Sequence, residues 1–172
     1  RINNTSGNAE ARIAYREDNA VLKFDIAGSE KVGINQYGLV FNGDTASANA
    51  LDDYEEGTWT PVGNGITLAD TVAGYYTKIG DLVYFSCIFR FPSTSNTGDV
   101  IISGLPYNCK NGSDGNYIQG AYTIYSDQGN AFNVLLQNNT NQFVVYNLSG
   151  NRATNNGFSN AYLRVAGTYK VA

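Results

Sequence analysis

The strongest constraint on the fold of this chain is a strict alternation of side chains in the run LVYFSCIFRF, residues 82–91. On one side of an extended strand the side chains are almost all large and apolar, which is the period-2 pattern of a strand with a buried face. The opposite side is only partly apolar, as expected where a sheet also meets a neighbouring subunit. The predicted faces are Val83, Phe85, Cys87, Phe89 and Phe91 on the buried side, and Leu82, Tyr84, Ser86, Ile88 and Arg90 on the other.

The chain continues this strand pattern from residue 57 onward. Short apolar runs are separated by polar turns, several of which contain the turn dipeptide Asn-Gly. In the last run Leu163, Val165 and Tyr169 alternate with Arg164 and Lys170. Tyrosine occurs 13 times and methionine is absent, so β-forming residues outweigh helix formers. We therefore expect an all-β fold in which residues 51–172 form an antiparallel β-sandwich of the jelly-roll type.

The first 50 residues have a weaker version of the same pattern. Strand-like runs occupy residues 11–18, 20–28 and 31–43, and in the second run Leu22, Phe24 and Ile26 alternate with polar residues. So few large apolar side chains cannot bury enough surface to fold alone, and identical chains are the simplest partners. The polar stretch 44–53 predicts a boundary between a domain of residues 1–50 and a domain of residues 51–172.

Charge and composition exclude several classes of partner. The net charge is −4 and the isoelectric point 4.7, whereas affinity for nucleic acid comes mainly from lysine and arginine. No apolar stretch reaches the length of about 20 residues that a membrane-spanning helix needs. We expect neither a nucleic-acid partner nor membrane insertion. Cys87 and Cys109 are expected to be two free thiols, with Cys87 buried in a strand. The missing initiating methionine indicates a fragment of a longer protein.

The only dense acidic cluster lies in ALDDYEEGTWTP, residues 50–61, which also contains the only tryptophan. The chain has no histidine, which removes the usual general base and the commonest zinc ligand. Two carboxylates can serve a glycosidase, but neighbours in sequence are poorly placed to flank one sugar bond. Calcium is a second option, although the spacing departs from an EF-hand loop. We expect a structural joint first, a calcium site second and a catalytic site third, with no cofactor.

Three stretches together, GLVFNGDTASANALDDYEEGTWTP, GYYTKIGDLVYFS and ISGLPY, resemble a module near the C-terminus of bacteriophage tail fibres and related virion or prophage fibre proteins. The resemblance covers residues 33–107. It implies a non-enzymatic virion protein, a homotrimer with a short interchain β-stranded stalk followed by a globular β head, joined upstream to the rest of the fibre. It also implies that LDDYEEGTWTP is the joint between stalk and head. The residues themselves agree, because we expect Trp59, with Pro61 beside it, to begin the first head strand and Tyr54 and Trp59 to wedge into the base of the sandwich.

Fibre heads of this kind commonly bind lipopolysaccharide, other bacterial surface glycans or an outer-membrane protein. Aromatic rings beside asparagine, aspartate and glutamine suit sugars, and loops on a rigid sandwich are where such groups are expected. Three loops fit, at residues 106–117, 137–142 and 150–160. The candidate receptor-binding residues are Tyr107, Asn108, Lys110, Asp114, Asn116, Tyr117, Arg152 and Phe158.

Two other functions remain open. The β-rich composition also allows an extracellular carbohydrate-binding lectin or adhesin of cellular origin, although that reading does not account for the fibre-like stretches. A polysaccharide-depolymerising tailspike is the third alternative. Such enzymes usually have long parallel β-helix repeats and separated carboxylates in a groove, and this sequence has neither pattern.

Overall fold

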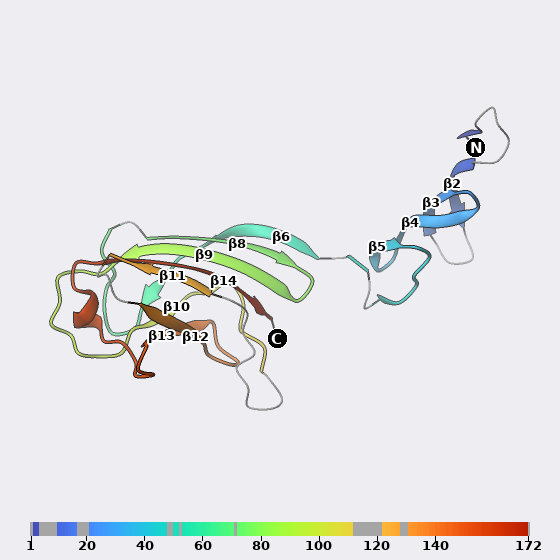
Figure 1. The fold of residues 1–172 in the computed structure, drawn as a ribbon. Helices are drawn as coiled ribbons and strands as arrows, with labels where there is room; N and C mark the ends of the chain where they lie inside the picture. Colours follow the sequence, from blue (N-terminus) through green and yellow to red (C-terminus); the bar gives the residue numbers. More distant parts are fainter. Residues whose placement is uncertain are drawn as a thin grey trace. The chain divides into compact units, whose positions relative to one another are not determined.

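The computed structural model describes residues 2–3, 10–16, 21–47, 50–51, 53–70, 72–111, 122–127 and 131–171. The fold is all-β with antiparallel sheets, as expected from the sequence (Figure 1). The chain divides into two compact units, a first unit of residues 1–54 and a second unit of residues 55–172. In the described part of the chain, no helix has the length and apolar character needed to span a membrane.

The first unit is one five-stranded antiparallel sheet in which every strand pairs with its neighbour along the chain. Its β3–β4 hairpin turns at Ala27 and Gly28, which both have positive φ, so a glycine fits this turn well. This ladder forms within one chain, and the predicted pairing of strands between chains stays a prediction. The strands are β1 (Ile2–Asn3), β2 (Glu10–Arg16), β3 (Val21–Ile26), β4 (Ser29–Asn35) and β5 (Gly38–Phe41).

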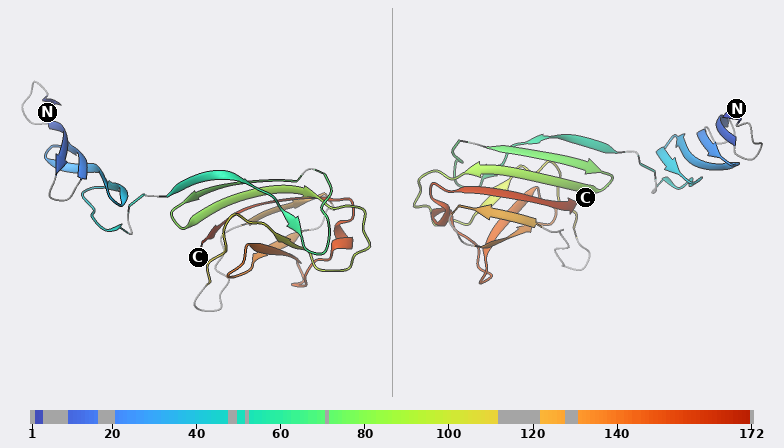
Figure 2. Two further views of the ribbon diagram at one scale, coloured as in Figure 1. Left: turned by 180° about the vertical axis from the view of Figure 1, so that it is seen from behind. Right: turned by 45° about the horizontal axis from the view of Figure 1, so that its top comes forward.

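The second unit consists of two stacked antiparallel sheets (Figure 2). The five-stranded sheet has the order β11-β14-β9-β8-β6, and the four-stranded sheet has the order β12-β13-β10-β7. Strands of the five-stranded sheet are β6 (Tyr54–Trp59), β8 (Ala73–Ile79), β9 (Leu82–Arg90), β11 (Tyr122–Ser126) and β14 (Tyr162–Lys170). Strands of the four-stranded sheet are β7 (Val62–Gly63), β10 (Ile101–Ser103), β12 (Phe132–Leu136) and β13 (Gln142–Asn147).

The core of the second unit lies between the two sheets. Phe85 of β9 contacts Phe143 of β13 with ring centroids 6.2 Å apart, so side chains of both layers meet in the middle. The predicted alternation is confirmed, because the four inward residues of β9, and Phe91 directly after it, are at most 6% exposed. In β14, Leu163, Val165 and Tyr169 are likewise buried. Jelly-roll topology and trimerisation stay predictions.

The connections of the second unit gather at two ends. We name as the proximal end the one where β6 starts, next to Glu55. It contains the Gly80–Asp81 turn, whose Asp81 carbonyl accepts a hydrogen bond from the N–H of Val171. The opposite, distal end contains the connection after β9 and the connection between β13 and β14, where the N–H of Phe91 donates to the Ala161 carbonyl. A short 3₁₀ helix, η2 (Asn155–Phe158), lies at this distal end.

Candidate functional site

Trp59 is held by a glycine on the neighbouring strand. The indole is 7% exposed and its Nε1–H donates to the Tyr75 carbonyl at 3.3 Å. A Cβ atom at Gly74 would lie 2.6 Å from the indole, so only a glycine leaves room for the ring. Trp59 ends β6 rather than beginning a strand, which corrects the prediction. Pro61, two residues later, has no N–H with which to continue the ladder.

The acidic stretch before Trp59 takes part in the structure of the proximal end. Glu55 accepts a hydrogen bond from the Tyr107 hydroxyl and lies 3.9 Å from the Lys78 ammonium. The Lys78 ammonium also lies 5.5 Å from the centre of the Tyr107 ring. The hydrogen bond to Glu55 raises the pKa of Tyr107. Tyr54 is 60% exposed, so it does not wedge into the sandwich of this chain as predicted.

The residues predicted in the first loop are only partly described. Tyr107 packs edge-on against Tyr76, with ring centroids 5.7 Å apart, and exchanges hydrogen bonds through its backbone with the Tyr169 hydroxyl. Asn108 and Lys110 are exposed beside it. The predicted contacts Asp114, Asn116 and Tyr117 lie outside the described residues. The described part of this loop is therefore at the proximal end, anchored by Tyr107.

Arg152 and Phe158, predicted in the third loop, lie at the distal end. The Arg152 guanidinium donates to Asp99 at 2.7 Å and lies 3.4 Å from the Tyr146 hydroxyl. Phe158 is 1% exposed and stacks on Phe91 with ring centroids 5.2 Å apart. Because it is a core side chain, Phe158 is not available for a surface contact, and we withdraw it as a receptor-binding candidate.

The five described residues among the eight predicted ones thus lie at two different ends of the second unit. Arg152 lines a hollow of about 420 Å³, whose other lining residues include Asn147, Leu148 and Thr154. Tyr107, Asn108 and Lys110 belong to the opposite end of the same unit. The second predicted loop also lies proximally, because the N–H of Cys109 donates to the Thr140 carbonyl at 2.8 Å.

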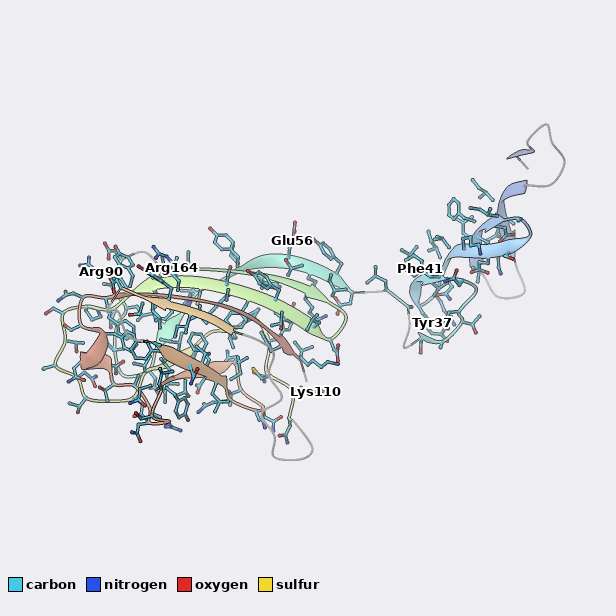
Figure 3. All side chains as sticks on the ribbon, viewed as in Figure 1. Tyr37, Phe41, Glu56, Arg90, Lys110 and Arg164 are labelled. Atoms are coloured by element: carbon cyan, nitrogen blue, oxygen red, sulfur yellow. The ribbon has the colours of Figure 1, made fainter. Side chains whose placement is uncertain are left out.

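Sequence reasoning missed a groove on the outer face of the five-stranded sheet. This groove of about 420 Å³ lies between the exposed rings of Tyr75 on β8 and Tyr125 on β11. Its floor contains the small residues Ser86 and Ala166, which face each other on β9 and β14. Arg164 also lines the groove, with its guanidinium carbon 5.3 Å from the centre of the Tyr125 ring. Figure 3 places Arg164 near Arg90 on this outer face.

One face of the first unit is apolar and exposed. Strand pairing places Ile13, Phe24, Val32 and Phe41 in one row across the sheet, and Tyr15, Leu22, Ile34 and Leu39 in the next. We call these two rows, with Ile26, the apolar face. Its seven most exposed side chains are 37% to 65% accessible, and they are Ile13, Tyr15, Leu22, Phe24, Ile26, Ile34 and Phe41.

The opposite face of the first unit is closed by the chain itself. Val21 and Val40 are buried there, and Lys23 forms an ion pair with Glu30. A Cβ atom at Gly33 would lie 2.5 Å from Glu30 Oε1, so this side is filled. The period-2 pattern of β3 was predicted, but its large apolar residues are the ones left exposed.

The acidic stretch does not gather into a metal site in the part of the chain that the structure describes. No group of three or more histidine, cysteine, aspartate or glutamate side chains is placed there to hold a metal ion. Both cysteines are free and buried, as expected for Cys87.

Comparison of the chain with protein-family models, with curated protein sequences and with solved structures finds no match.

Proposed function

We propose that this chain is the distal part of a bacteriophage tail fibre, which attaches the virion to a glycan or outer-membrane receptor on the host cell. In this proposal the chain is a non-enzymatic homotrimer, the first unit is the stalk and the second unit is a jelly-roll-like head. The fibre-like stretches at residues 33–107 suggest the class. The observation that carries the proposal is the apolar face of the first unit.

An exposed apolar face of this size is expected to be buried against a partner. The seven most exposed side chains each leave on the order of 100 Å² accessible, so the face offers about 700 Å², close to the ~800 Å² per partner of a standard interface. Monomeric proteins rarely expose larger contiguous apolar patches than this. The same face on identical chains is an apolar partner that is always present, and a closed rotation of such chains covers all copies. This supports self-association of the stalk.

The distal end of the head is the best candidate for receptor contact. The preceding chain reaches the second unit at Glu55, at the proximal end, which leaves the distal loops clear of that connection. The hollow beside Arg152 offers a charged group and an apolar rim formed by Leu148, which is 69% exposed. Three heads on one fibre would multiply a weak single contact through avidity.

Two measurements test this function. Sedimentation equilibrium is expected to give three times the 18.6 kDa mass of the chain. The fluorescently labelled protein is expected to adsorb to some strains in a panel of bacteria and to leave their surface polysaccharide at its original size. A monomer at micromolar concentration, the absence of adsorption to every strain, or shortening of the polysaccharide would each count against the proposal.

A further inference from the structure

We propose that the groove between Tyr75 and Tyr125 binds a negatively charged saccharide, with Arg164 as the residue that recognises the acidic group. The inference rests on the proposed function, because it adds to the distal hollow a second receptor contact, on the outer sheet face, and gives its chemical class. It differs from the loop residues predicted from sequence, since all its side chains come from four neighbouring strands of one sheet.

The shape of the groove suits a flat ring. Tyr75 and Tyr125 are three strand spacings apart, or about 14 Å at ~4.8 Å per spacing. Between them Ser86 and Ala166 are too small to fill the space above the sheet. A sugar ring presents apolar C–H groups that pack on aromatic faces, while its hydroxyls reach polar side chains such as Ser86.

The positive charge of Arg164 favours a ligand that carries an acidic group. Arg164 is exposed, and among the described residues no carboxylate forms an ion pair with it. Its guanidinium carbon lies 5.3 Å from the centre of the Tyr125 ring, and a guanidinium can bind a carboxylate or phosphate through two N–H groups. The described lining contains no acidic side chain. A carboxylate or phosphate on the sugar would therefore meet an unpaired cation.

A second copy of the chain fits this face less well. Burial under another subunit would remove Arg164 from water, and a buried charge without a partner is costly. The apolar face of the first unit has no such charge in its two rows. A free saccharide leaves one side of the guanidinium hydrated.

The test is binding of the whole chain to an array of bacterial oligosaccharides that carry uronic acids, phosphate groups or no charge. We expect retention of acidic members, weakening as sodium chloride rises. The Arg164→Gln variant is expected to bind the retained sugars about tenfold more weakly or worse, because a charge-assisted pair is lost. Tyr125→Ala is expected to weaken binding as well. Whether uronate or phosphate sugars are retained identifies the anion.

Lys170→Gln is the matched control. It removes the same charge from the same strand, but at the proximal end beside Asp81, so binding should equal that of the unchanged chain. The proposal is overturned if no acidic sugar is retained, or if Arg164→Gln binds as the unchanged chain does. It is also overturned if Tyr75→Glu lowers the mass of the oligomer, because the groove would then lie between subunits.

Adsorption to cells separates this inference from the function on which it rests. If the unchanged chain and Arg164→Gln adsorb equally to the same strains, the groove assignment fails and the attachment function stands. If the unchanged chain adsorbs to no strain, the attachment function fails irrespective of the array.

Discussion

At the scale of single residues, the contact between Trp59 and Gly74 explains why a tryptophan and a glycine occur where they do. The indole lies flat over the one position in β8 that has no side chain, and its N–H is satisfied by the Tyr75 carbonyl. A second glycine and aromatic pair lies between the same two strands, where a Cβ atom at Gly57 would lie 2.8 Å from the Tyr76 ring. Glycines on adjacent strands therefore accept the aromatic rings that anchor β6.

We expect Gly74→Ala to destabilise the second unit by about 1–3 kcal/mol, because the new methyl group overlaps the buried indole. Chemical unfolding followed by tryptophan fluorescence measures the change. Gly157→Ala is the control, since its nearest neighbour is 3.8 Å from the new atom, and it should shift stability by no more than ~0.5 kcal/mol. Equal effects of the two substitutions would contradict this account.

The two thiols make a second prediction at this scale. Burial raises the pKa of both Cys87 and Cys109 from the ordinary 9.0 to about 12. At pH 8 the folded chain should therefore react with a disulfide reagent far more slowly than the unfolded chain, because only the thiolate attacks. The two buried thiols therefore contribute fully to the free energy of unfolding below pH 9. This contribution is lost as the pH rises toward 12.

The rate of reaction with the disulfide reagent, measured in buffer and in guanidinium chloride, tests the protection of the thiols. The denaturant midpoints of unfolding at pH 8 and pH 10.5 test the loss of stability with pH. Cys87→Ala should reduce the difference between these two midpoints. Rapid labelling of both cysteines in the folded protein would refute the burial argument.

At the scale of elements, the sheet of the first unit places the Lys23–Glu30 ion pair on one face and exposed large apolar residues on the other. This is the reverse of the usual arrangement of a half-buried sheet. Each strand contributes side chains to the apolar face in strict alternation, so the face is continuous across β2 to β5. A one-residue slip of any strand would replace its apolar residues there by polar ones.

Replacing Phe24 and Ile34 by aspartate should dissociate the oligomer, because two charges enter the centre of the apolar face. Both side chains are exposed within one chain, so the substitutions should change the stability of the first unit itself only slightly. Sedimentation velocity should show the mass falling toward that of a single chain, while near-ultraviolet circular dichroism of the second unit stays unchanged. Lys31→Ser, an exposed change outside the apolar face, should leave the mass as it was. An unchanged mass for the double variant would place the self-association elsewhere.

The sequence predicted elements well where large side chains repeat with period 2. The buried rows of β9 and β14 were predicted residue by residue, because their phenylalanine, leucine and valine side chains leave no alternative period. Phe158 was misjudged because its neighbours in sequence are polar, whereas its partners, Phe91 and Phe132, are far away in the chain. The groove was not predicted, because Tyr75 and Tyr125 come to lie on one face of the same sheet only through its strand order.

At the scale of the whole molecule, the two units differ in how their strands find partners. In the first unit every pairing joins consecutive strands, and the paired residues are close in sequence. In the second unit β14 pairs with β9 from Tyr162 against Arg90 to Lys170 against Leu82. The sequence predicted strands in both units, but such long-range pairings depend on the packing of the whole sheet and have no local signature.

The central place of β14 also bears on biosynthesis. This strand lies between β9 and β11, so it completes the middle of its sheet and not an edge. On the ribosome the first unit can close its ladder early, and β8 can pair with β9, but β9 and β11 both lack their shared neighbour until β14 has emerged. A premature stop codon between Ser126 and Tyr162 would leave the edges of β9 and β11 exposed at once, and such nascent chains would be substrates for chaperones and proteases.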